Sequence, residues 1–209
     1  MRKAERQQEI LRILDETYHG MNTALNYKSP FELLVAVILS AQCTDERVNK
    51  ITARLFPKYN TPQKMVKLSL QEMEEAIKEC GLYHAKAKNL LGTCHRLLEE
   101  YNGQVPATRE DLMTLPGAGR KTANVMLSVA FHQPALAVDT HVFRVSKRLG
   151  LAKGEDPLLV EQELLKVVPK EKWSEAHHWL IWHGRKICKA RNPLCQECPV
   201  RELCPSYKK

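Results

Sequence analysis

Four cysteines near the end of the chain have the spacing of a metal-binding group, Cys188-x6-Cys195-x2-Cys198-x5-Cys204. Cysteine clusters of this density inside cells are usually metal sites rather than disulfides. Structural zinc favours paired thiols with about 2–4 residues between them, and only Cys195 and Cys198 form such a pair. A [4Fe–4S] cluster accepts varied spacings and often has a proline after a ligand. The spacing leaves both metals open, and either one is expected to be mainly structural because four protein ligands leave no open position.

Two basic residues, Lys189 and Arg191, lie between the first two of these cysteines. A metal would tie the loop at both ends and hold the two side chains in place, which suits the binding of phosphate groups. The alternative is that both are solvated surface charges of little energetic consequence. We expect a DNA-binding loop here.

The segment Leu115-Pro-Gly-Ala-Gly-Arg-Lys-Thr-Ala123 lies between two helical patterns. Pro116 ends the first helix, and Gly117 and Gly119 permit positive φ in a tight turn. The second helix then begins with free N–H groups and the positive end of its dipole, which can bind a phosphate without reading base sequence. The pattern indicates a helix–hairpin–helix, with an ordinary corner between two helices as the alternative.

Lys121 lies in the first turn of that second helix, where the helix dipole and Arg120 both disfavour a charged ammonium. A neutral amine is what nucleophilic attack on a sugar carbon requires. Asp139 follows an apolar stretch at the start of another helix, where a carboxylate could stabilise an oxocarbenium ion or relay a proton. The alternatives are a solvated lysine and a helix N-cap, and Asp139 could serve as cap and carboxylate at once.

The bulk composition points to a polyanionic partner. The chain has 209 residues, enough to bury a core, and its 32 Lys and Arg against 24 Asp and Glu give a net charge of +8. No apolar run of about 18 residues occurs, and the N-terminus lacks the apolar stretch of roughly 7–15 residues found in signal peptides. We therefore expect an intracellular protein, in which Cys43, Cys80 and Cys94 are small buried hydrophobes.

Helical signals dominate the elements that must position these residues, and no stretch alternates with period two for long enough to indicate a sheet. An all-α fold is predicted. Ser69 and Glu72 form a capping box, and Gly81 is expected to end that helix in the left-handed conformation. The polar tail after Cys188 cannot build a hydrophobic core, so something other than burial must hold it. Helices are expected over 31–41, 71–80, 84–101, 108–115, 120–130, 140–149, 157–168 and 173–187, and another one opens at Thr61-Pro62.

Together these features resemble the endonuclease III family of the helix–hairpin–helix DNA glycosylase superfamily. The resemblance spans nearly the whole chain and rests on Leu39-Ser-Ala-Gln-Cys-Thr-Asp45, Gly81-Leu-Tyr83, the 115–123 segment, Val138-Asp-Thr-His141 and the four cysteines. It implies two helical domains with a DNA-binding cleft between them. One would be a six-helix barrel over 22–133 that contains the hairpin, and the other a discontinuous cluster domain formed by 1–21 and 134–209. It also favours [4Fe–4S] over zinc.

By the same resemblance, the protein would be a bifunctional DNA glycosylase and AP lyase that removes oxidised pyrimidines from duplex DNA. Lys121 would form a Schiff base at C1′, Asp139 would be its essential carboxylate, and β-elimination would cleave the strand 3′ to the lesion or abasic site. A damaged base would be flipped from the stack. Gln42 would fill the vacated space, and Leu82 would wedge the opposite strand. The expected DNA contacts are Gln42, Leu82, Gly117, Gly119, His141, Lys189 and Arg191.

The resemblance also implies a monomer in the bacterial cytoplasm, associated with the nucleoid. Gln42 and Leu82 have structural alternatives, a polar helix end and a core leucine. Asp45, Thr140 and His141 are candidates to line the cleft, with helix capping or packing as the alternative for each. The tryptophans Trp173, Trp179 and Trp182 and the histidines His177, His178 and His183 are expected to be structural.

Three rival functions fit part of the same pattern. A glycosylase specific for mismatched adenine or thymine would typically lack the nucleophilic lysine at position 121. A non-catalytic DNA-binding module would use the hairpin and the cluster for affinity alone. A zinc-stabilised interaction protein would lack the brown colour of an iron–sulfur cluster.

Overall fold

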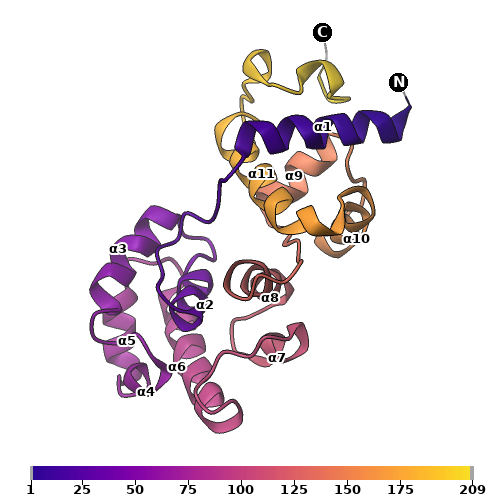
Figure 1. The fold of residues 1–209 in the computed structure, drawn as a ribbon. Coiled ribbons are helices and arrows are strands. Elements are labelled where there is room, and N and C mark those ends of the chain that lie inside the picture. The colour runs from indigo at the N-terminus through magenta and orange to yellow at the C-terminus, as the bar shows by residue number, and fades with distance from the viewer. Residues whose placement is uncertain (1, 208–209) are drawn as a thin grey trace. The chain divides into compact units, whose positions relative to one another are not determined.

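The computed structural model describes residues 2–207, and all regular elements in this range are helical (Figure 1). The all-α prediction is therefore confirmed. No helix among the described residues is both long and apolar enough to cross a membrane. The elements are α1 (Lys3–Tyr18), α2 (Pro30–Leu39), α3 (Asp45–Leu55), α4 (Pro62–Met65), α5 (Leu70–Ile77), α6 (Tyr83–Glu100), α7 (Arg109–Thr114), α8 (Arg120–Val125), the π-helical η1 (Met126–Ala130), α9 (Thr140–Arg148), α10 (Pro157–Val167), α11 (Trp173–Lys186) and the 3₁₀ turns η2 (Lys170–Lys172), η3 (Cys195–Glu197) and η4 (Arg201–Leu203).

The chain forms two compact units, each with its own core. Unit 1 combines the residues up to Thr23 with those from Gln133 onward, and unit 2 is the continuous segment Ala24–His132. Unit 1 is therefore built from both ends of the chain, and unit 2 from its middle.

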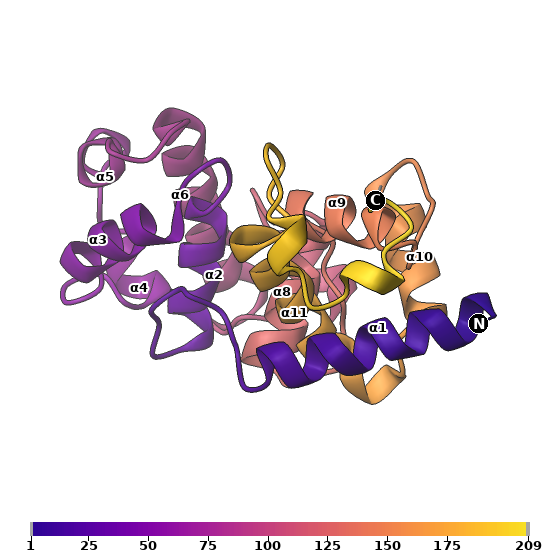
Figure 2. The same ribbon diagram turned by 90° about the horizontal axis from the view of Figure 1, so that it is seen from above.

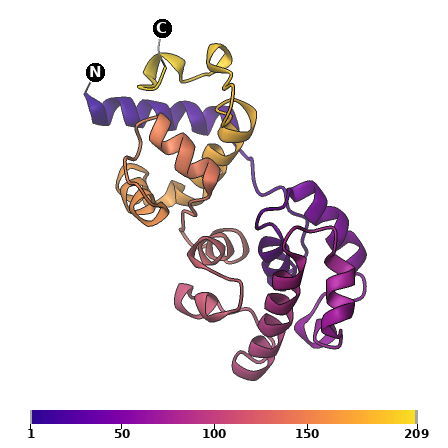
Figure 3. The same cartoon turned by 180° about the vertical axis from the view of Figure 1, so that it is seen from behind.

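Helix α2 is the centre of unit 2. Ser29 caps it by accepting a hydrogen bond from the Glu32 amide at 3.2 Å, and Pro30 occupies its first turn. Every residue from Phe31 to Leu39 is buried, which is what a helix that is apolar all round requires. It packs against α3, α6, α8 and η1 (Figures 1 and 3).

Unit 1 is built around the packing of α1 and α9 on α11. Figures 1 and 2 show α1 lying alongside α11. Ile10 and Leu14 of α1 share a core with Val142 and Val145 of α9 and with Leu180 of α11. The segment 188–207 is not held by burial in the same way, because Val200 is its one buried residue.

The segments flanking Gly81 and Val125 differ from the sequence-based expectation. Helix α5 ends at Ile77, and the left-handed residue is Leu82 at φ 60°, not Gly81. The expected left-handed cap at Gly81 is thus wrong, because the chain reverses one residue later, where α6 begins. The expected helix over 120–130 forms, but its second half is the π-helix η1, which leaves the buried hydroxyl of Ser128 without a hydrogen-bond partner.

Candidate cluster site and nucleic-acid interface

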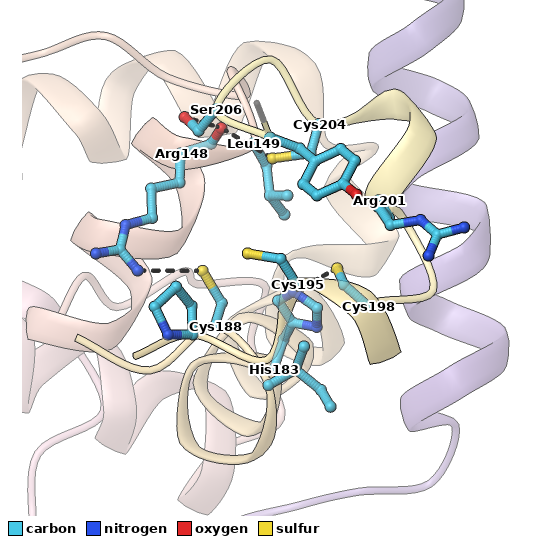
Figure 4. Close-up of a pocket in the computed structure, with 12 residues that line it drawn as sticks. Arg148, Leu149, His183, Cys188, Cys195, Cys198, Arg201, Cys204 and Ser206 are labelled. Atoms are coloured by element: carbon cyan, nitrogen blue, oxygen red, sulfur yellow. Dashed lines mark hydrogen bonds between the residues drawn. The ribbon is translucent and has the colours of Figure 1, made fainter. Parts of the chain in front are cut away.

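The four clustered cysteines line one cavity in unit 1. Its volume is about 250 Å³, and Figure 4 shows the four thiols around it. Cys188 follows α11, Cys195 opens η3, Cys198 follows η3, and Cys204 follows η4. The 3₁₀ turns η3 and η4 thus position three of the thiols around the cavity, and the segment after α11 positions the fourth.

The donor set suits a cluster of several metal atoms. Within residues 2–207, no three His, Cys, Asp or Glu side chains converge as the ligands of one metal ion. A [4Fe–4S] cluster needs no such convergence, because each cysteine binds a different iron. Burial raises the pKa of Cys198 to about 11 and also raises the pKa of Cys204. A thiol must release its proton to bind iron, so metal binding at these residues is coupled to proton release.

Two arginines of α9 hold the first ligand loop. Arg148 donates from Nη1 to the Lys189 carbonyl at 2.7 Å and from Nη2 to the Ala190 carbonyl at 3.1 Å, and its Nη1 lies 3.6 Å from the Cys188 Sγ (Figure 4). Arg144 donates from Nε to the Cys188 carbonyl at 3.2 Å. Lys189 and Arg191 are exposed on the loop so held. These arginines were not among the residues predicted from the sequence, although their i, i+4 spacing places both on one face of a helix.

A buried histidine links the cluster cavity to α1. The Tyr18 hydroxyl lies 3.0 Å from the Nδ1 atom of His183, and the Nε2 atom lies 3.7 Å from the Cys198 Sγ. Burial lowers the pKa of His183 to about 4, so the ring is neutral near pH 7. One tautomer uses both contacts: Tyr18 donates to Nδ1, and Nε2–H donates to the sulfur.

The hairpin lies between α7 and α8 in unit 2. Gly117 has a φ of 78°, and a Cβ added there would meet the Asn89 side chain at 2.9 Å. Both the turn and the close packing therefore require glycine. Gly119 has a φ of −86°, so this residue does not use the positive φ that glycine permits. Gly119 is the N-cap of α8, which requires extended backbone.

Lys121 is exposed in the first turn of α8 and belongs to unit 2. Asp139 belongs to unit 1 and is partly buried. It caps α9, because its Oδ1 atom accepts a hydrogen bond from the Val142 amide at 2.7 Å. The N-cap alternative for Asp139 is therefore confirmed, and its role as a reacting carboxylate stays a prediction.

Two residues downstream of Asp139, His141 is half-buried in α9. Its Nδ1 atom lies 3.2 Å from the Arg144 Nη2. Burial lowers the pKa of His141, and the Asp139 carboxylate acts in the opposite direction. The ring is therefore neutral near pH 7 and can accept or donate a hydrogen bond without adding charge.

Gln42 and Leu82 lie on neighbouring loops of unit 2 and share an unusual conformation. Both have left-handed backbone, with φ of 52° and 60°, and both are exposed. A Cβ added at Gly81 would lie 3.5 Å from the Gln42 carbonyl oxygen, so the loops are adjacent. Leu82 is 58% exposed, which excludes the alternative of an ordinary core leucine.

Comparisons with known proteins agree with this arrangement. Residues 35–170 match a family model described as HhH-GPD superfamily base excision DNA repair protein, and residues 188–204 match the iron–sulfur binding domain of endonuclease III. The chain is 51% identical to the endonuclease III proteins of Haemophilus influenzae and Escherichia coli strain K12, over 100% of this chain and 98% of each relative.

Solved structures show the same fold. A trapped covalent intermediate of endonuclease III with DNA is similar to this chain with a TM-score of 0.95 and 49% identity, covering 99% of this chain and 97% of the other. A thermostable thymine-DNA glycosylase has a TM-score of 0.85 at 25% identity, with 97% of each chain covered.

The helical fold, the hairpin and the cysteine segment define a base-excision-repair DNA glycosylase of the helix–hairpin–helix superfamily. Within this class the chain belongs to the endonuclease III family. It is a DNA glycosylase with AP-lyase activity and carries a [4Fe–4S] cluster. The non-catalytic module and the zinc-stabilised interaction protein are thereby excluded.

Proposed function

We propose that this chain removes oxidised pyrimidines from duplex DNA with Lys121 as the nucleophile and Asp139 as its partner carboxylate. The observation that carries the proposal is the exposed position of Lys121 in the first turn after the hairpin. The trapped covalent DNA complex of a relative supports a reaction through a covalent protein–DNA intermediate.

The proposed reaction needs few protein groups. The Lys121 amine attacks C1′, the bond from C1′ to the base breaks, and the base leaves with a proton. Opening of the sugar ring gives an imine between Lys121 and C1′. Loss of a proton from C2′ then expels the 3′ phosphate, which cuts the strand on the 3′ side, and water releases the lysine.

In this scheme Asp139 stabilises positive charge on the sugar or moves a proton. Its Oδ1 is engaged by the Val142 amide, which fixes the carboxylate at the start of α9. The second oxygen would act on the substrate. A carboxylate held in a fixed orientation needs little reorganisation when charge develops, which is the main advantage of such a site.

DNA would be held mainly through its backbone, as the excess positive charge favours. Gly117 and Gly119 of the hairpin, the cluster loop with Lys189 and Arg191, and the ring of His141 would contact the strand. Gln42 and Leu82 would enter the duplex after the damaged base has left the stack. Their exposure and their adjacent loops support this assignment.

We further propose that Cys188, Cys195, Cys198 and Cys204 are the cluster ligands. Unit 2 would be the barrel domain predicted over 22–133, and unit 1 the cluster domain. The predicted cleft would receive the DNA. The chain would act as a monomer at the nucleoid in the bacterial cytoplasm.

The test is borohydride trapping on a duplex that contains one oxidised pyrimidine. Wild-type protein should give a covalent complex that survives denaturation, and Lys121→Ala should give none. Lys67→Ala, which removes another exposed lysine of unit 2, is the matched control and should trap normally. Trapping by Lys121→Ala would refute the assignment.

Asp139→Asn separates the cap from the chemistry, because asparagine caps helices about as well as aspartate. We expect normal stability and DNA affinity, with single-turnover base release slowed by about 10²-fold or more. Single-turnover rates near those of the wild type would leave Asp139 as a helix cap only.

A further inference from the structure

Lys86 of α6 is a buried lysine that the proposed chemistry does not use. Lys86 is 4% exposed, and its ammonium nitrogen has three hydrogen-bond acceptors. Nζ donates to the Leu39 carbonyl at 2.9 Å, to the Ala41 carbonyl at 2.6 Å and to the Cys80 Sγ at 3.0 Å. An ammonium has three N–H donors, so this charge is fully hydrogen-bonded inside the protein.

The three acceptors of Lys86 lie in the two segments that lead to Gln42 and Leu82. Leu39 ends α2, and Ala41 directly precedes Gln42. Cys80 lies two residues before Leu82. One ammonium therefore ties together the segments that carry the two exposed left-handed residues.

The two loops also meet around the sulfur of Cys80. The Cys80 thiol donates to the Leu39 carbonyl at 3.1 Å. Burial, together with a hydrogen bond to Cys80, raises the pKa of the Cys43 thiol, which follows Gln42. The main-chain amide of Lys86 donates to the Leu82 carbonyl at 3.1 Å. The side chain and the main chain of Lys86 thus bind both loops.

Left-handed backbone at a residue other than glycine costs about 1 kcal/mol or more and persists only where the surroundings hold it. Gln42 and Leu82 are exposed, so burial of their side chains cannot supply that restraint. The restraint must come from the backbone on either side. The end of α2 is the negative end of a helix dipole, and a buried cation there is favourable.

We propose that Lys86 is a positioning residue that presents Gln42 and Leu82 together to the DNA. This inference rests on the proposed roles of those two residues. Without the ammonium, the two loops would separate or change conformation, and the side chains would enter the duplex less readily. The reaction at the sugar would not be affected directly, since Lys86 touches neither Lys121 nor the substrate in this scheme.

The experiment compares two DNA substrates for the complete, cluster-containing protein. One is a duplex with a paired oxidised pyrimidine, which must be extruded from the stack. The other is a single strand with a preformed abasic site, where nothing has to be extruded. For Lys86→Met, kcat/KM on the duplex should fall by about 10–100-fold, the cost of a misplaced positioning group. On the single strand it should change by less than about threefold.

Lys88→Met is the matched control, because it removes an exposed lysine from the same helix, and it should leave both substrates unaffected. Lys86→Gln keeps two N–H donors and should show a smaller loss with the same preference between substrates. It also keeps the test usable if Lys86→Met does not fold.

Equal losses on both substrates, or no loss on the duplex, would overturn the proposal. Failure of the wild type to release the oxidised base from the duplex would instead refute the proposed function.

Discussion

Helix α2 and the segment 188–207 are both essential to their units but are held by different forces. Every residue of α2 after Pro30 is buried, so apolar contacts on all sides fix its position. The segment 188–207 buries Val200 alone, and it is fixed by its ends, by the arginines of α9 and by the cluster. In unit 2 the shape comes from burial, and in the tail of unit 1 it comes from coordination and hydrogen bonds. Different substitutions or solvent conditions should therefore disrupt the two regions.

The largest effect is expected from removal of a cluster ligand. Cys195→Ala should lose the bound iron and with it on the order of 10 kcal/mol of metal-binding free energy, as for other structural metal sites. The tail should become sensitive to proteolysis, and unit 2 should stay helical. Iron content and limited proteolysis check this. Cys94→Ala, which truncates a buried cysteine of unit 2, should keep its iron. Retention of iron by Cys195→Ala would contradict the assignment of the ligands.

Truncation of a core side chain in α2 should lower stability without loss of iron. Leu34 is fully buried, so Leu34→Ala should lower the free energy of unfolding by about 2–5 kcal/mol. The folded variant should bind iron as the wild type does. Denaturant unfolding and iron content measure the two effects. Leu70→Ala, at a side chain that is 38% exposed, is the control and should change stability by less than about 0.5 kcal/mol. Loss of iron from folded Leu34→Ala would show that the two regions are not independent.

Acid should also destabilise the two units to different extents. Burial, followed by the charges of His177 and Arg185, lowers the pKa of His178 to about 3 from a usual value of 6.5. Between these values the unfolded chain binds a proton that the folded chain does not, so stability falls as the pH drops below 6.5. The described histidines of unit 2, unlike His178, are exposed to solvent. Unit 1 should consequently unfold first on acidification.

The matched variant is His178→Gln, measured by denaturant unfolding at several pH values between about 7 and 5. Its stability should fall less steeply than that of the wild type, by at most about 1.4 kcal/mol per pH unit. Parallel profiles for the two proteins would show that His178 does not titrate on unfolding.

The smallest effect is expected at a helix end on the surface of unit 2. Ser69 accepts a hydrogen bond from the Glu72 amide at 3.2 Å, and the Glu72 carboxylate accepts from the Ser69 amide at 2.8 Å. Ser69→Ala should cost about 1 kcal/mol, and Ser69→Asp should restore most of it. Thermal unfolding of the three proteins tests the pair. No loss in Ser69→Ala would mean that α5 is held by packing alone.

Features set by neighbouring residues were predictable from the sequence. The caps at Ser69 and Asp139 lie at the predicted positions, because each depends on residues within one turn. The turn at Gly117 is equally local. The segment Asp45–Leu55 was not predicted as a helix, although Val48, Ile51 and Leu55 have helical spacing and are buried there.

Features set by tertiary contacts were not predictable. The rule that glycine takes the left-handed position selected Gly81, whereas Leu82 adopts that conformation on a loop that lies next to the Gln42 loop. The sequence does show that Lys86 is unusual, because it lies on the same face of α6 as Leu90 and Leu97, where an apolar residue is expected. A lysine at such a position must find acceptors in the interior, and the sequence does not say where they lie.

The discontinuity of unit 1 has a consequence for synthesis on the ribosome. Unit 2 is complete once residue 132 has emerged, and nothing in its core waits for later residues. Helix α1 is translated before it, yet the partners of Ile10 and Leu14 on α9 and α11 are translated after it. The nascent chain therefore carries a helix with an uncovered apolar face ahead of a folded module, which chaperones can bind. Iron must enter after that, because the iron–sulfur segment 188–204 is translated last.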